Sequence, residues 1–173
     1  MASGREERAW VRRAQAGSPS AIEALYRLHW PRAYRAAYLV VHDAAGAEDI
    51  AQEAFLAAVR SLDRFDRRRP FAPWLHRIVV NRAIDWARAR SLRQEVDLAD
   101  SLAHEPDPPA ALPALVDALR ELPPEQRVVI VLRHLLDYTP GEIAELLELP
   151  RGTVNSRLRR GLDELAERMR ADR

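Results

Sequence analysis

Apolar residues recur at helical spacing along most of the chain, and no stretch shows the strict alternation of a half-buried strand. Clusters of Gly and Pro separate these stretches and mark the breaks between elements. We therefore predict an all-α fold. The predicted helices cover residues 5–16, 20–41 with a kink or interruption at Pro31, 47–65, 71–90, 115–122 and 125–136, followed by a pair within 138–165.

Residues 138–165 read YTPGEIAELLELPRGTVNSRLRRGLDEL and predict two short helices joined by a tight turn. Thr139 fits an N-cap, and Glu142 lies three residues later, as in a capping box. The turn falls near Glu148 and Pro150. If Glu148 adopts a left-handed conformation, where glycine is common, the cost is about 1 kcal/mol. The apolar stripe of the first helix consists of Ile143, Leu146 and Leu147.

The second helix of this pair combines an apolar face with a polar and cationic start. This layout is typical of a helix-turn-helix, whose recognition helix presents its first residues to the major groove. Arg can bond guanine edges, and Asn and Ser can bond bases or phosphates. An ordinary helical hairpin with a solvated Arg face is the weaker interpretation of the whole stretch. The predicted buried residues are Val154, Leu158, Leu162 and Leu165, and the predicted DNA contacts are Arg151, Thr153, Asn155, Ser156, Arg157 and Arg160.

The segment 47–65 predicts a strong helix with a second, carboxylate-rich stripe. Its predicted core face consists of Ile50, Ala54, Ala58, Leu62 and Phe65. A different face carries Asp49, Gln52, Glu53 and Leu56, spaced about one turn apart. Such a stripe could dock a basic partner. From spacing alone, an ordinary solvated helix face is the better interpretation.

Residues 66–70 read DRRRP and form a cationic loop before a helix in which aromatic residues and arginines interleave. Bases stack on aromatic rings while Arg follows phosphates, so this composition suits single-stranded nucleic acid. The alternative is that Trp74 and Trp86 belong to the core, and for Trp74 we favour that alternative.

An acidic, Pro-rich stretch poor in large apolar residues follows the long helix and predicts a flexible linker. We expect two small helical domains, residues 1–92 and 114–173, joined by a linker over residues 93–113.

The net charge of +1 does not indicate nucleic acid by itself, but basic residues cluster at 64–69, 82–93 and 151–160. The chain has no cysteine, and its five histidines are scattered, so no metal or cofactor site is expected. No apolar run could span a membrane, and the N-terminus lacks a signal peptide. A cytoplasmic protein is expected, with no evident catalytic constellation.

Three ordered segments resemble the extracytoplasmic-function group of bacterial sigma-70 factors, over nearly the whole length. The segment AEDIAQEAFLAAVRSLDRF is similar to the helix that docks on RNA polymerase. RPFAPWLHRIVVNRAIDWAR is similar to the segment that melts and reads the −10 element. LPPEQRVVIVLRHLLDYTPGEIAELLELPRGTVNSRLRRGLDEL is similar to the domain that reads the −35 element.

This resemblance implies roles for particular residues. The stripe of Asp49, Gln52, Glu53 and Leu56 would contact the beta-prime clamp of polymerase, which reverses the interpretation from spacing alone. The loop would capture a flipped base, although it lacks the Gly-containing sequence common in the family. The implied contacts to the −10 element are Phe65, Asp66, Arg67, Arg68, Arg69, Phe71, Asn81 and Arg82.

The implied partners are core RNA polymerase, through its beta-prime clamp and beta flap, promoter DNA in duplex and single-stranded form, and an anti-sigma protein. Two rival functions share parts of this sequence. One is a helix-turn-helix regulator that binds duplex without polymerase; the other is an adaptor that binds only proteins. Neither accounts for the carboxylate stripe together with the Arg–aromatic segment.

Overall fold

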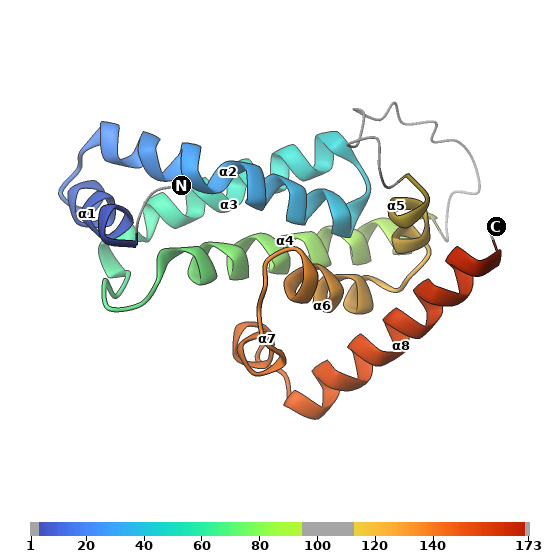
Figure 1. The fold of residues 1–173 in the computed structure, drawn as a ribbon. Coiled ribbons are helices and arrows are strands. Elements are labelled where there is room, and N and C mark those ends of the chain that lie inside the picture. The colour runs from blue at the N-terminus through green and yellow to red at the C-terminus, as the bar shows by residue number, and fades with distance from the viewer. Residues whose placement is uncertain (1–3, 95–112, 172–173) are drawn as a thin grey trace.

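The structure, a computed structural model, describes residues 4–94 and 113–171, and these are helices joined by short loops (Figure 1). The predicted all-α class is confirmed for these residues. The helices are α1 Gly4–Gln15, α2 Pro19–Val41, α3 Ala44–Arg60, the short 3-10 helix η1 Leu62–Arg64, α4 Phe71–Gln94, α5 Pro113–Arg120, α6 Pro124–His134, α7 Pro140–Leu147 and α8 Arg151–Ala171.

Helices α1 to α4 form an N-terminal group in which α2, α3 and α4 pack on one another. The predicted core face of α3 is confirmed, since Ile50, Ala54 and Ala58 are buried. Helix α2 continues through Pro31, so of the two predicted alternatives, a kink or an interruption, the interruption is wrong. A proline inside a helix costs about 3 kcal/mol. Fully buried alanines after Pro31, including Ala33 and Ala37, fix this part of α2 against its neighbours and compensate for that cost.

Helices α5 to α8 form a C-terminal group around a stripe on α8 that includes a glycine. Val154, Leu158 and Leu165 are buried as predicted, but Leu162 is 39% exposed, so its predicted burial is wrong. The fourth buried position is Gly161, where an added Cβ would lie 2.8 Å from Ile130 Cδ1. The close approach of α8 to α6 therefore places glycine on the buried face and turns Leu162 to its edge.

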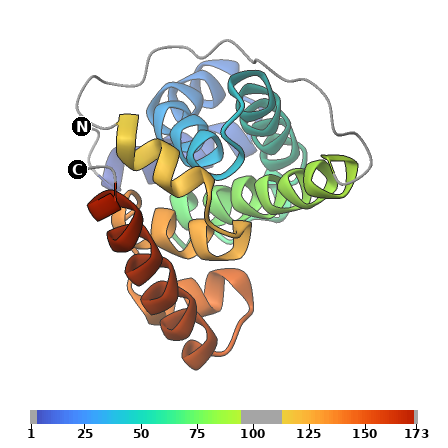
Figure 2. The same ribbon diagram turned by 90° about the vertical axis from the view of Figure 1, so that its right-hand side faces the viewer.

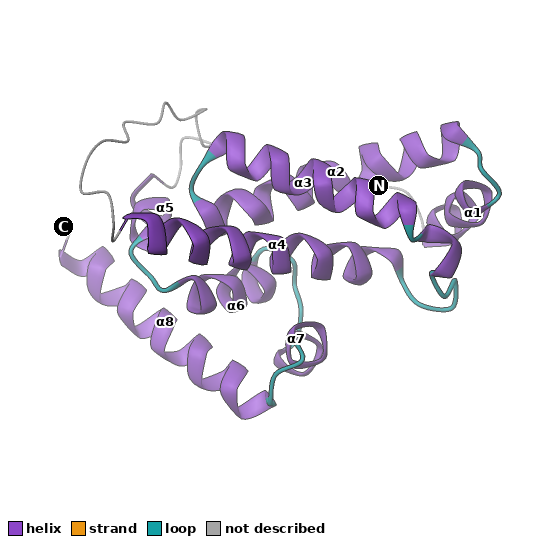
Figure 3. Cartoon of the chain, turned by 180° about the vertical axis from the view of Figure 1, so that it is seen from behind, coloured by secondary structure: helices purple, strands orange, loops and turns teal. Residues whose placement is uncertain are grey.

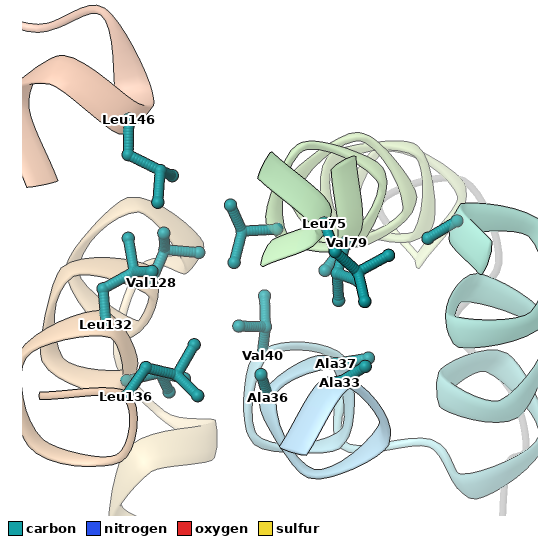
Figure 4. Close-up of a cluster of buried hydrophobic side chains, with 14 of the residues drawn as sticks. Ala33, Ala36, Ala37, Val40, Leu75, Val79, Val128, Leu132, Leu136 and Leu146 are labelled. Atoms are coloured by element: carbon teal, nitrogen blue, oxygen red, sulfur yellow. The ribbon is translucent and has the colours of Figure 1, made fainter. Parts of the chain in front are cut away.

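The two groups pack against each other through an apolar seam. Helix α6 lies on α2 and α4, α5 lies on α2, and α7 lies on α4. Figure 4 shows Ala36 and Val40 of α2 facing Leu132 and Leu136, which lie on or just after α6. All four of these side chains are buried. The described helices thus share one continuous core.

Two polar contacts cross the same seam. His76 Nδ1 of α4 lies 2.8 Å from the hydroxyl of Tyr138, which precedes α7. The guanidinium of Arg127 on α6 donates to the carbonyl of Val40 near the end of α2. Burial, together with the charge of Arg120 and against the opposing charges of Glu125 and Glu121, lowers the pKa of Arg127 to about 10. Most of the predicted linker, residues 95–112, lies outside the described residues, and the predicted domain boundaries remain a prediction.

Candidate protein and nucleic-acid interfaces

The carboxylate stripe of α3 lies on the face turned away from the core. Asp49, Gln52 and Glu53 are exposed, and Leu56 is 55% exposed, the highest value among the large apolar side chains of the described residues. Gln52 Nε2 donates to Glu48 Oε1 at 3.3 Å, so polar groups along the stripe are aligned one turn apart. An exposed apolar side chain at the end of a stripe with two carboxylates suits a partner surface that is basic beside the carboxylates and apolar at Leu56.

Aromatic residues of α2 extend this surface, and the sequence reasoning above did not include them. The Tyr26 ring stacks on Trp30 with centroids 4.9 Å apart and meets the ring of Phe55 edge-on at 5.0 Å. Tyr26 is 36% exposed. The spacing of Tyr26, Trp30, Tyr34 and Tyr38 at four-residue intervals is the signal that could have identified this row.

The loop 66–70, between η1 and α4, is exposed throughout (Figure 3). Asp66 Oδ1 accepts hydrogen bonds from the backbone N–H and the Nε–H of Arg68, at 3.0 and 3.1 Å. The side-chain bond from Arg68, followed by its backbone bond, lowers the pKa of Asp66. Arg67 and Arg69 make no ion pair with a described residue and remain available to a phosphate. The loop therefore presents two free cations beside one that is tied back.

Two of the predicted base contacts next to this loop are buried. Phe65 is 8% exposed and Phe71 is 4% exposed. Their ring centroids lie 5.7 Å apart, and those of Phe65 and Phe71 lie 4.7 and 5.6 Å from that of Trp74. Gln15 Nε2 of α1 donates to the carbonyls of Leu62 and Phe65 at 2.8 and 3.0 Å, which fixes the start of the loop. In this conformation the phenyl rings support the loop from beneath.

The remaining predicted contacts to the −10 element, Asn81 and Arg82, lie on α4 and differ in exposure and in pairing. Asn81 is exposed. Arg82 is partly exposed, and its Nε lies 3.7 Å from Glu53 Oε2 of the carboxylate stripe. This ion pair places the predicted polymerase surface and the predicted −10 surface next to each other.

The helix-turn-helix prediction is confirmed by α7 and α8. Thr139 and Glu142 form the reciprocal capping box, with Thr139 N–H donating to Glu142 Oε2 at 2.8 Å. Glu148 adopts the left-handed conformation, with φ 54° and ψ 43°. Helix α8 then starts at Arg151 and runs past α5 (Figure 2). The turn thus orients the first residues of α8 outward, as a recognition helix requires.

The predicted contacts on α8 differ in how freely they can reach DNA. Arg151, Asn155 and Arg160 are exposed. Thr153, Ser156 and Arg157 are partly buried. Ser156 Oγ donates to the Thr153 carbonyl at 2.9 Å, which leaves the hydroxyl oxygen as an acceptor.

Arg157 lies close enough to Glu125 of α6 to affect its ionisation. Burial would raise the pKa of Glu125, but a backbone hydrogen bond, the side-chain bond from Arg88 and the charges of Arg88 and Arg157 lower it overall. Glu125 is therefore an anion held between cations from two different helices.

The described residues give little support to a membrane span or a metal site. None of its helices is long and apolar enough to cross a membrane. Residues 4–94 and 113–171 contain no group of three or more His, Asp or Glu side chains that could hold a metal ion. The chemistry of the described surfaces is that of binding charged partners.

Comparison with known families assigns both groups of helices. The model of Sigma-70 region 2 matches residues 25–93, and that of Sigma-70 region 4 matches residues 112–165. The ECF RNA polymerase sigma factor SigW of Bacillus subtilis is 30% identical, with 92% of this chain and 95% of the relative covered. RNA polymerase sigma factor CarQ of Myxococcus xanthus is 31% identical, with 91% and 94% covered.

A solved structure has the same fold. CnrH, determined in complex with the cytosolic domain of CnrY, matches with a TM-score of 0.73 and 27% identity, covering 96% of this chain and 99% of that one. The carboxylate stripe, the cationic loop with its long helix and the helix-turn-helix follow in the order of the matched regions. The chain belongs to the extracytoplasmic-function group of the sigma-70 family of RNA polymerase sigma factors.

Proposed function

We propose that this sigma factor directs core RNA polymerase to promoters through three separate surfaces. The first is the exposed stripe of Asp49, Gln52, Glu53 and Leu56 on α3, which binds the beta-prime clamp. The observation that carries this assignment is the exposure of the stripe on a helix whose opposite face is buried. Tyr26 borders the stripe and adds apolar area to the same contact.

The second surface is the loop 66–70 with the exposed side of α4, which holds the opened strand of the −10 element. Arg67 and Arg69 offer free guanidinium groups to phosphates, and Asn81 offers an amide to a base edge. Phe65 and Phe71 contribute by supporting the loop rather than by stacking on a base in this conformation. Holding an unstacked base returns part of the cost of melting, which is a few kcal/mol per base.

The third surface is the start of α8, which reads the −35 element as duplex. Arg151, Asn155 and Arg160 are exposed there and can reach phosphates or base edges in the major groove. Each surface alone is small and binds weakly. When both DNA-binding surfaces are held on polymerase, binding of promoter DNA at one surface raises its effective concentration at the other.

An anti-sigma protein is the expected regulator. CnrH was solved with the cytosolic domain of CnrY, and this chain shares that fold at 27% identity. The exposed apolar side chains Tyr26 and Leu56 supply a surface that such a protein could cover in competition with polymerase.

The second surface is tested by separating promoter binding from promoter opening. We expect replacement of Arg67, Arg68 and Arg69 by Ala to reduce permanganate reactivity of the melted region more than it reduces closed-complex formation with core polymerase. The matched control replaces Arg5, Arg8 and Arg12 of α1, which are equally exposed, by Ala. Equal loss of both steps, or the same loss in the control, would show plain phosphate attraction and contradict the assignment.

A further inference from the structure

Two arginines of α4 that the proposed surfaces do not include are neutralised by the C-terminal helices. The guanidinium of Arg77 pairs with the carboxylate of Glu148, which lies in the turn between α7 and α8. Arg88 pairs with Glu125 in the first turn of α6, with Nε and Nη2 at 3.0 and 2.9 Å from Oε1. Both carboxylates lie across the seam from the helix that carries the arginines.

The other paired arginines of α4 behave differently. Arg82 pairs with Glu53 of α3, and Arg90 pairs with Asp43 at the start of α3, at 2.9 Å. These partners belong to the same N-terminal group of helices. Among the described residues, the ion pairs of Arg77 and Arg88 therefore depend on the position of the C-terminal group, whereas those of Arg82 and Arg90 do not.

The two ion pairs neutralise the arginines but add little to the stability of the fold. The side chains of Arg77 and Arg88 are 43% and 57% exposed, and exposed ion pairs add little to the stability of a fold. The packing of the two groups of helices against each other is held by the buried apolar seam around Val40 and Leu132. A phosphate can consequently replace either carboxylate without unfolding the chain.

The Arg88 pair has donors that a phosphate could also take. Arg88 directs Nε–H and an Nη2–H of its planar group at one anionic oxygen, and guanidinium groups present the same side to phosphate oxygens. Glu148 holds its carboxylate at Arg77 from a left-handed position that glycine would occupy at lower cost. The carboxylates thus occupy places on α4 where phosphate oxygens would be bound.

We propose that Arg77 and Arg88 are phosphate-binding residues of α4, and that Glu148 and Glu125 occupy them in the free chain. This inference rests on the proposed function of α4 in holding single-stranded DNA. The C-terminal group and DNA then compete for the same two guanidinium groups. Because such coupling is reciprocal, DNA bound at these arginines weakens the contact between the two groups of helices.

The test compares the full chain with the double variant Glu125→Gln/Glu148→Gln. The probe is a fluorescent oligothymidylate of about 20 nucleotides, long enough to cross a strand-binding surface. Anisotropy titrations at an ionic strength of about 0.1 M should show binding tighter by about threefold to tenfold, as expected from releasing two exposed ion pairs. The slope of log K against log salt should steepen by about 1.4, for two regained phosphate contacts on a single strand.

The matched control is Glu145→Gln/Glu167→Gln, which removes the same charge from two exposed carboxylates of the C-terminal group that pair with no described residue. Its affinity should remain close to that of the unchanged chain. Equal tightening in both double variants, or none in the first, would overturn the proposal.

A second comparison tests whether the gain in DNA affinity comes from Arg77 and Arg88. Adding Arg77→Gln and Arg88→Gln to the first double variant should remove the gain, whereas adding Arg12→Gln of α1 and Arg35→Gln of α2, both exposed, should not. Persistence of the gain without Arg77 and Arg88 would overturn the proposal and assign it to Arg157, which also lies near Glu125.

Transcription by core polymerase is measured separately with the same variants. Failure of transcription by the unchanged chain would contradict the proposed function. The oligothymidylate titrations would still decide whether the carboxylates and DNA compete.

Discussion

Removing the Tyr138 hydroxyl tests how firmly the two groups of helices are joined. In the variant Tyr138→Phe the ring stays, and only the hydrogen bond to His76 Nδ1 is lost. The tyrosine backbone is held independently, because its N–H donates to the Leu132 carbonyl at 3.0 Å. His76 is 3% exposed, so water does not replace the lost partner. A buried polar group left without its partner costs about 1–3 kcal/mol, which is the expected loss in unfolding free energy.

The ionisation states support this magnitude rather than a larger one. Burial lowers the pKa of His76 to about 4, and burial raises the pKa of Tyr138. Both groups are therefore neutral at pH 7. A neutral buried group left unpaired costs about 1–3 kcal/mol, whereas a charged one would cost more.

Urea unfolding at pH 7, followed by circular dichroism, measures the effect. The matched control is Tyr34→Phe, because Tyr34 is partly exposed and its hydroxyl makes no hydrogen bond to a described residue. We expect the control to change the unfolding free energy by less than about 0.5 kcal/mol, as surface substitutions do. A loss in Tyr138→Phe no greater than that of the control would show that the bond across the seam does not hold the two groups together.

Three further predictions concern the interfaces and the buried histidines. Reversing Asp49 and Glu53 to Arg should abolish co-purification with core polymerase while circular dichroism stays unchanged, because both side chains are exposed; normal co-purification would refute the docking assignment. Arg157→Ala should weaken binding to the upstream element by about 1–3 kcal/mol in footprinting, if this side chain reads a base; an unchanged footprint would remove it from the contact surface. Unfolding free energy should fall as pH drops from 6.5 toward 4, by about 1.4 kcal/mol per pH unit for each histidine that the unfolded chain protonates and the folded chain does not. Burial lowers the pKa of His76 to about 4 and of His42 to about 3, so both contribute; a flat pH profile would contradict their burial as neutral groups.

Each of these measurements has a matched control. For docking, Asp163→Arg and Glu167→Arg make the same charge change on exposed positions of α8. For the upstream element, Arg159→Ala removes an exposed arginine from the same helix. For the pH profile, His134→Gln removes an exposed histidine and should leave the slope unchanged.

Local features of the fold could be predicted from the sequence because they depend on neighbouring residues. The cap at Thr139 and the left-handed turn at Glu148 follow from capping chemistry and turn length. The buried face of α3 follows from helical spacing. Packing decided two further points. Of the kink or interruption predicted at Pro31, the interruption does not occur, because neighbouring helices hold α2, and Leu162 is displaced from the buried face by Gly161.

The contact between the two groups of helices could not be predicted in the same way. Periodicity shows that Val40 and Leu132 face a core, but not which helix covers them. The pair of Arg77 and Glu148 joins residues 71 positions apart, and nothing local specifies it. The same limit applies to the candidate sites. Spacing placed the polar stripe on one face of α3 but favoured an ordinary solvated face, and only the family resemblance implied docking. The burial of Phe71 became visible only in three dimensions.

Run-off transcription from genomic DNA, with core polymerase and the purified chain, tests the central claim most directly. The account predicts transcripts that depend on this chain and start downstream of one shared pair of promoter elements, and it predicts that the chain without polymerase protects no such pair. Absence of chain-dependent transcripts, together with a palindromic footprint formed by the chain alone, would contradict it and favour a regulator that acts without polymerase.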